Sequence, residues 1–119
     1  MANILGEWPV KTHVPVPGLF MYPLIQAGHK VVIKDEHGQL YFEAYSSVNP
    51  TTPYFRIKVE YSGSTGAVQG KERYMPTGVE YSVTAYIKEF GDYAYILGYA
   101  QTHTTAEDSG GQWDGNRPK

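Results

Sequence analysis

Hydrophobic and polar residues alternate with a period of two along much of this chain, which is the spacing of a β-strand that buries one face. The alternation is strictest over residues 54–62, where Phe55, Ile57 and Val59 point one way and charged side chains point the other. Spacing typical of an amphipathic helix is almost absent. Other segments with strand-like patterns are residues 10–16, 19–25, 30–34, 39–45 and 71–75. The pattern therefore predicts an all-β fold.

The longest alternating segments, residues 79–89 and 93–103, predict a hairpin that turns at Gly91-Asp92. Glycine at the first central position favours a two-residue type II′ turn, which places Tyr86 opposite Leu97. Counting outward from this turn sorts the hairpin into an aliphatic face and a phenolic face. The aliphatic face holds Val83, Ala85, Ile87, Ala94, Ile96, Gly98 and Ala100, and the phenolic face holds Tyr86, Tyr95, Leu97 and Tyr99. We expect the aliphatic face to line the core.

The phenolic face has two interpretations. Tyrosines on adjacent strands form cross-strand pairs, each worth about 0.2–1 kcal/mol to a sheet, so the face can simply pack under a loop or a second sheet. Left exposed, the same side chains offer a large contact area with little entropy to lose, which suits an interface. Because an exposed aromatic patch is unusual on a monomer, the second interpretation predicts a flat ligand or a homo-oligomer.

Residues 104–119 lack periodicity and are rich in glycine and polar side chains, which predicts a flexible C-terminal tail after a single domain over residues 1–103. Within this tail, Trp113 is followed by Asp114 and Asn116. An indole can stack on the apolar face of a sugar while polar neighbours bind its hydroxyl groups. The alternatives are an incidental tryptophan in a disordered tail, and a Trp113 that folds back onto the core or docks on a neighbouring chain.

Two segments resemble the fibronectin type III family. Residues 54–61, Tyr-Phe-Arg-Ile-Lys-Val-Glu-Tyr, are similar to that family's middle strand, and a glycine-rich loop follows at 63–70. Residues 76–86 resemble the family's Pro-Gly-x-x-Tyr-x-Val-x-x-Tyr segment, with one residue inserted between Pro76 and Gly78. The tryptophan that the family usually carries in an early strand has no counterpart here. The resemblance implies an immunoglobulin-like sandwich, a fold that mostly serves recognition and assembly.

Charge and composition narrow the partners. With 10 basic and 12 acidic side chains in 119 residues, no basic cluster marks a surface for nucleic acid or for membrane lipid. The absence of cysteine removes disulfides, thiolate zinc sites and thiol nucleophiles. No signal peptide is predicted, and no apolar stretch is long enough to span a bilayer. We expect a soluble protein synthesised in the cytoplasm, with release by a leaderless route or incorporation into a particle left open.

Patterns typical of catalysis or of metal binding are missing as well. The four histidines are scattered, with no nucleophile elbow and no His-x-His pair. The paired carboxylates at residues 35–36 and 107–108 lie in a predicted turn and in the predicted tail, where solvation is expected rather than acid–base chemistry. We therefore expect no enzyme activity, no metal and no cofactor.

These observations together predict an antiparallel β-sandwich, immunoglobulin or fibronectin III-like, with a disordered C-terminal tail; a partly closed barrel is the structural alternative. The predicted function is a non-enzymatic, lectin-like binding module. It would bind carbohydrate through Trp113, Asp114 and Asn116 and form homo-oligomers through the phenolic face. The alternative is a structural or assembly protein, such as a virion, appendage or surface component, that uses the phenolic face and its sheet edges for subunit contacts.

Overall fold

A computed structural model of the chain describes residues 4–15, 29–45, 51–103 and 108–118. The strands are β1 (Gly6–Pro15), β2 (His29–Glu36), β3 (Gln39–Tyr45), β4 (Phe55–Ser62), β5 (Ala67–Tyr74), β6 (Val79–Phe90), β7 (Tyr93–His103) and β8 (Asp108–Pro118). The strand predicted over residues 19–25 lies outside the described residues. None of the residues that are described forms a helix long and apolar enough to cross a membrane.

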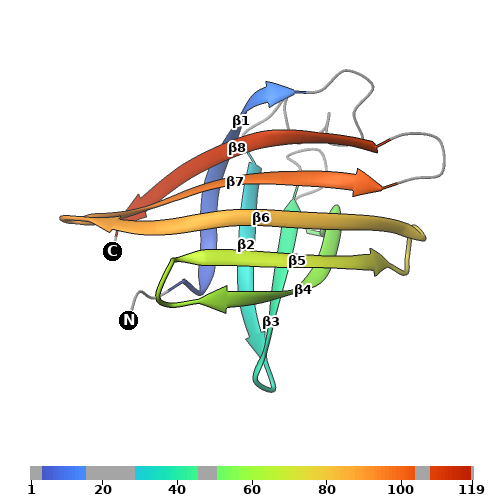
Figure 1. Ribbon diagram of the computed structural model, residues 1–119, viewed down its shortest axis with the longest axis horizontal. Helices are drawn as coiled ribbons and strands as arrows, with labels where there is room; N and C mark the ends of the chain where they lie inside the picture. Colours follow the sequence, from blue (N-terminus) through green and yellow to red (C-terminus); the bar gives the residue numbers. More distant parts are fainter. Residues whose placement is uncertain (1–3, 16–28, 46–50, 104–107, 119) are drawn as a thin grey trace.

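The eight strands close into an antiparallel barrel. Each strand pairs with the next along the chain, and β8 returns to pair with β1 (Figure 1). The predicted sandwich and the fibronectin III-like topology are therefore wrong, whereas the all-β prediction is confirmed. Side chains alternate in the same way in a sandwich and in a barrel, because both bury one face of every strand. The alternation within a strand therefore does not indicate which strands pair where the barrel closes.

The C-terminal segment is a strand of the barrel. Residues 108–118 pair with β7 over their whole length and with the second half of β1 on their other side. The prediction of a disordered tail is wrong for these residues. Glycine and polar side chains have low strand propensity, but hydrogen bonding to a neighbour on each side overrides that preference. Residues 108–118 are therefore the strand that completes the barrel.

Two strands, β1 and β4, bend so that each pairs with different neighbours along its length. β1 pairs first with β2 and then with β8, while β4 pairs first with β3 and then with β5. A glycine of the neighbouring strand faces each bend. Gly115 lies against the carbonyl of Pro9 and Gly70 against the carbonyl of Lys58, and a Cβ atom at either glycine would clash with that oxygen. These glycines thus permit close strand contact at both corners of the barrel.

Inward side chains pack into a continuous core. Aromatic rings stack at its centre, where Phe55 lies 4.3 Å from Tyr81 and 6.1 Å from Phe42 between ring centroids. Trp8 is fully buried, and its indole nitrogen donates a 3.0 Å hydrogen bond to the carbonyl of Ile4. The aliphatic core residues include Val10, Val31, Ile33, Ile57, Val59, Val68, Val83, Ile87 and Ile96. The polar side chains that alternate with these positions consequently face outward.

The β6–β7 hairpin has the register predicted from its turn. Phe90 lies opposite Tyr93, and Tyr86 lies opposite Leu97. Gly91 adopts a positive φ of 50°, as the first central position of a type II′ turn requires. The aliphatic side chains of the hairpin are buried, while the phenolic face lies on the outer wall. The predicted division of this hairpin into two faces is therefore confirmed.

Candidate functional site

The outward side chains of β7 form a row of large groups, Tyr93, Tyr95, Leu97 and Tyr99, which we call the aromatic stripe. Tyr93 is 48% exposed, Leu97 37% and Tyr99 40%, while Tyr95 is partly buried. Since residues two apart on a strand share a face, the stripe extends along β7 for about 20 Å. The alternation that buries the small and aliphatic residues of β7 thus leaves a row of rings on the surface.

β6 contributes further rings beside the aromatic stripe. Tyr86 is 46% exposed and lies opposite Leu97. At the end of the hairpin, the exposed ring of Phe90 packs against Tyr93 with 6.2 Å between the ring centroids. Large side chains from two adjacent strands therefore share one exposed surface.

β8 places hydrogen-bonding groups along the other side of the aromatic stripe. Gln112, Asp114 and Asn116 lie opposite members of the stripe in the β7–β8 register. The Tyr95 hydroxyl donates a hydrogen bond to the Asp114 carboxylate, and this bond raises the pKa of the Tyr95 phenol. The phenol stays protonated and the carboxylate is held beside the rings. The phenolic face and the pair Asp114 and Asn116, which the sequence presents as separate features, thus lie on one surface.

Trp113 does not belong to this surface. Its side chain points inward and is 3% exposed, with its ring 5.7 Å from Phe42 and its edge against Gly98. Stacking on a sugar requires an accessible face of the indole. The prediction that Trp113 binds carbohydrate is therefore corrected, and the alternative in which it folds onto the core holds. The order polar, apolar, polar at residues 112–114 is the sequence signal for this placement.

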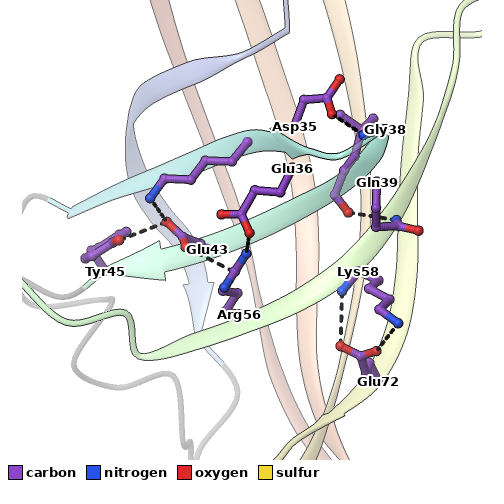
Figure 2. Close-up of polar contacts among 11 residues, drawn as sticks. Asp35, Glu36, Gly38, Gln39, Glu43, Tyr45, Arg56, Lys58 and Glu72 are labelled. Carbon is purple, nitrogen blue, oxygen red and sulfur yellow. Dashed lines mark hydrogen bonds and ion pairs between the residues drawn. The ribbon is translucent and has the colours of Figure 1, made fainter.

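A polar hollow that the sequence did not reveal lies on the barrel wall next to the phenolic face. It has a volume of about 580 Å³ and lies where β4 and β5 separate beyond their short paired segment. Its side chains include Lys58, Glu60, Gln69, Lys71, Ser82 and Thr84. At its border, the backbone amide of Lys58 donates a 3.3 Å hydrogen bond to the Glu72 carboxylate (Figure 2). Because the lining comes from four strands, no local motif marks the hollow.

The outer wall of β2, β3 and β4 carries a buried carboxylate, Glu43, which alternation alone predicts to be exposed. Glu43 is 4% exposed. It accepts a 2.9 Å hydrogen bond from the Tyr45 hydroxyl and forms ion pairs with Lys34 at 3.1 Å and Arg56 at 3.3 Å (Figure 2). Burial and the bond to Glu43 raise the pKa of Tyr45 to about 12. Lys34 and Arg56 balance the charge of Glu43, and burial keeps its carboxylate from ligands. The role of Glu43 in this wall is therefore structural.

The carboxylates of the β2–β3 turn also have structural partners. Asp35 accepts a 3.0 Å hydrogen bond from the backbone amide of Gly38, and Glu36 pairs with Arg56 (Figure 2). Among the described side chains, no group of three or more histidines, aspartates or glutamates converges as a metal ion would require. These carboxylates therefore stabilise the turn and its strand neighbours.

The arrangement best suited to bind another molecule is thus the outer surface of β6, β7 and β8 with the hollow beside it. Its rings provide stacking area, and its amides, hydroxyls and carboxylates provide hydrogen bonds. No family model, no curated protein and no solved structure matches this chain.

Proposed function

We propose that this protein is a non-enzymatic binding module that recognises an extended carbohydrate along the aromatic stripe. The observation that carries the proposal is the position of β8, which brings Gln112, Asp114 and Asn116 alongside the rings of β7. In the sequence, residues 100–111 separate these polar residues from the last tyrosine, Tyr99. They become neighbours of the rings because β8 pairs with β7.

Sugar chemistry fits such a surface. A pyranose ring has an apolar face of C–H groups, which stacks on an aromatic ring, and a rim of hydroxyls, which need donors and acceptors in its plane. Tyr86 and Tyr99 offer exposed rings, while Gln112 and Asn116 offer amides that both donate and accept. The length of the stripe, about 20 Å, matches a chain of several sugar units better than a single sugar.

Self-association is the second candidate, because it would use the same surface. Phe90 and Tyr93 are each nearly half exposed at the end of the hairpin, and rings of this size on a monomer commonly mark a contact with another protein. A homo-oligomer that used these two rings together with the phenolic face would bury Tyr86 and Tyr99, which the first candidate needs for sugar. The two functions therefore compete, and a single set of variants separates them.

The test combines a glycan array with titration calorimetry on the array's best neutral oligosaccharide. We expect Tyr86→Ala and Tyr99→Ala each to weaken binding about tenfold, because each removes one stacking face, a loss of about 1.4 kcal/mol. Trp113→Phe should leave the affinity unchanged, since that side chain lies in the core. Met75→Ala, a change at a side chain 77% exposed on the β5–β6 turn, serves as the surface control.

Two results would overturn the carbohydrate proposal. One is an array with no signal at any protein concentration, together with no heat of binding at millimolar oligosaccharide in calorimetry. The other is a discrete oligomer in light scattering that Tyr86→Ala and Tyr99→Ala dissociate while no glycan binds, and this result would support self-association instead.

A further inference from the structure

The polar hollow and the aromatic stripe are joined through the sheet register. Gln69 on β5 lies opposite Thr84 on β6, and Thr84 lies opposite Tyr99 on β7. Gln69 and Thr84 line the hollow. Because neighbouring strands lie about 4.8 Å apart, the hollow begins within about 10 Å of the Tyr99 ring. A ligand stacked on Tyr99 can therefore reach the hollow by crossing two strands.

The lining of the hollow mixes donors and acceptors and contains no aromatic ring. Lys58 and Lys71 donate, Glu60 accepts, and the Gln69, Ser82 and Thr84 side chains do both. Carboxylates outside the hollow accompany the two cations, with Glu72 4.0 Å from the Lys58 ammonium and Glu80 3.7 Å from that of Lys71. Charges of both signs in this balance favour a neutral, hydroxyl-rich group over an anion.

Two contacts between β4 and β5 lie at the hollow, one at Gly70 and one at Glu72. Gly70 lies against the carbonyl of Lys58, so β5 still approaches β4 closely where their paired segment ends. Beyond it, the Glu72 carboxylate accepts the hydrogen bond of the Lys58 amide, at a position where the β4–β5 ladder has ended. A side-chain oxygen from the neighbouring strand thus satisfies a backbone donor that would otherwise draw the strands together. A site formed in advance in this way loses little free energy to reorganisation on binding.

We infer that the hollow is a second sugar subsite, which receives a neutral sugar unit of the same glycan whose preceding unit stacks on Tyr99. The inference rests on the proposed carbohydrate function and adds the direction of the chain. The glycan follows the aromatic stripe along β7 as far as Tyr99 and there turns across the strands toward β5, so that its terminal unit lies among Gln69, Lys71 and Thr84.

The experiment measures affinity against chain length by titration calorimetry. The probes are cello-, chito- and mannooligosaccharides of two to six units, with oligogalacturonates of the same lengths as the acidic comparison. For the neutral series that binds, we expect affinity to rise about tenfold between two and four units and then to level off. Gln69→Phe puts a rigid ring into part of the hollow and removes an amide from its lining, so it should remove this gain while disaccharide affinity stays the same. Gln69→Ala leaves the hollow open but removes one amide that would bind the sugar, so it should lose only part of the gain, whereas Tyr99→Ala should weaken binding at every length.

The outcomes separate the inference from the function on which it rests. If no oligosaccharide binds, both fail. If disaccharides bind but affinity does not grow with length, or grows equally in Gln69→Phe, the second subsite is wrong and the carbohydrate function stands. If oligogalacturonates gain more than the neutral series, and Lys58→Gln with Lys71→Gln abolishes that gain, the assignment to a neutral sugar is wrong. Thermal unfolding of each variant confirms that the comparison is made between folded proteins.

Discussion

Glu43 shows how a single buried charge is accommodated on the outside of a barrel. Its neighbours Lys34 and Arg56 come from the strands on either side, and Tyr45 comes from its own strand. Removing two charges from water costs free energy that their attraction only partly returns, so such a network adds little net stability. Losing one member is different, because the partners that remain are left without a counter-charge or an acceptor.

We predict that Glu43→Gln lowers the free energy of unfolding by about 2 kcal/mol, measured by urea denaturation. The effect is moderate because Lys34 and Arg56 are 47% and 32% exposed and can recover part of their hydration. Glu7→Gln is the matched control, since the exposed pair that Glu7 forms with Lys30 at 2.8 Å should contribute about 0.5 kcal/mol or less. Equal losses in the two variants would show that the burial of Glu43 does not matter.

At the scale of elements, the two bent strands decide how the barrel closes. β1 and β4 each pair with different neighbours along their length, and the change of partner occurs where Gly115 and Gly70 allow close backbone contact. The hollow lies at the β4 corner. A feature that closes the fold therefore also shapes the second part of the candidate site.

We predict that Gly70→Ala and Gly115→Ala each destabilise the protein by about 1–3 kcal/mol, because the added Cβ atom meets a carbonyl of the adjacent strand, which cannot move without disturbing the ladder. Gly63→Ala is the control: no atom lies within 4 Å of a Cβ there, and a change within about 0.5 kcal/mol is expected. Urea denaturation measures all three. If Gly70→Ala and Gly115→Ala were as stable as Gly63→Ala, the strands at the two corners would have room for a Cβ atom and the close contact would be contradicted.

At the scale of the whole molecule, the ionisation of buried tyrosines makes the stability of the protein depend on pH in the alkaline range. Burial raises the pKa of Tyr45 to about 12 from its ordinary value of 10.0, and burial also raises the pKa of Tyr54 and of Tyr81. In the unfolded chain these phenols lose their protons near pH 10, whereas in the barrel they keep them to higher pH. The stability that comes from this difference is therefore complete below pH 10 and declines as pH rises toward 12.

We predict that the melting temperature falls steeply between pH 10 and pH 12, the window set by the ordinary and the raised pKa of Tyr45. Tyr45→Phe removes one of the contributing phenols. The slope of unfolding free energy against pH in this window should therefore be shallower than in the parent by up to about 1.4 kcal/mol per pH unit. Thermal unfolding followed at several pH values gives both slopes, and identical slopes would contradict the raised pKa of Tyr45.

Part of this molecule was predictable from neighbouring residues. The β6–β7 register followed from the glycine of the turn, and the inward or outward direction of Tyr86, Leu97 and Tyr99 followed from alternation. Trp113 illustrates the opposite case. Its polar neighbours suggested a ligand-binding tail, but the segment is a strand, and the same alternation that exposes Asn116 turns the indole into the core. The side-chain pattern was informative there, and the glycine-rich composition concealed it.

The sequence by itself determined the all-β class and the two faces of its longest hairpin, because both depend on residues close together in the chain. Tertiary structure alone decided that β8 meets β1, that Asp114 and Asn116 lie beside the tyrosines, and that a hollow opens where β4 and β5 separate. The physical reason is that hydrogen bonds between strands join backbone groups, which are the same in almost every residue. The choice of partner strand is therefore made by the packing of the whole barrel.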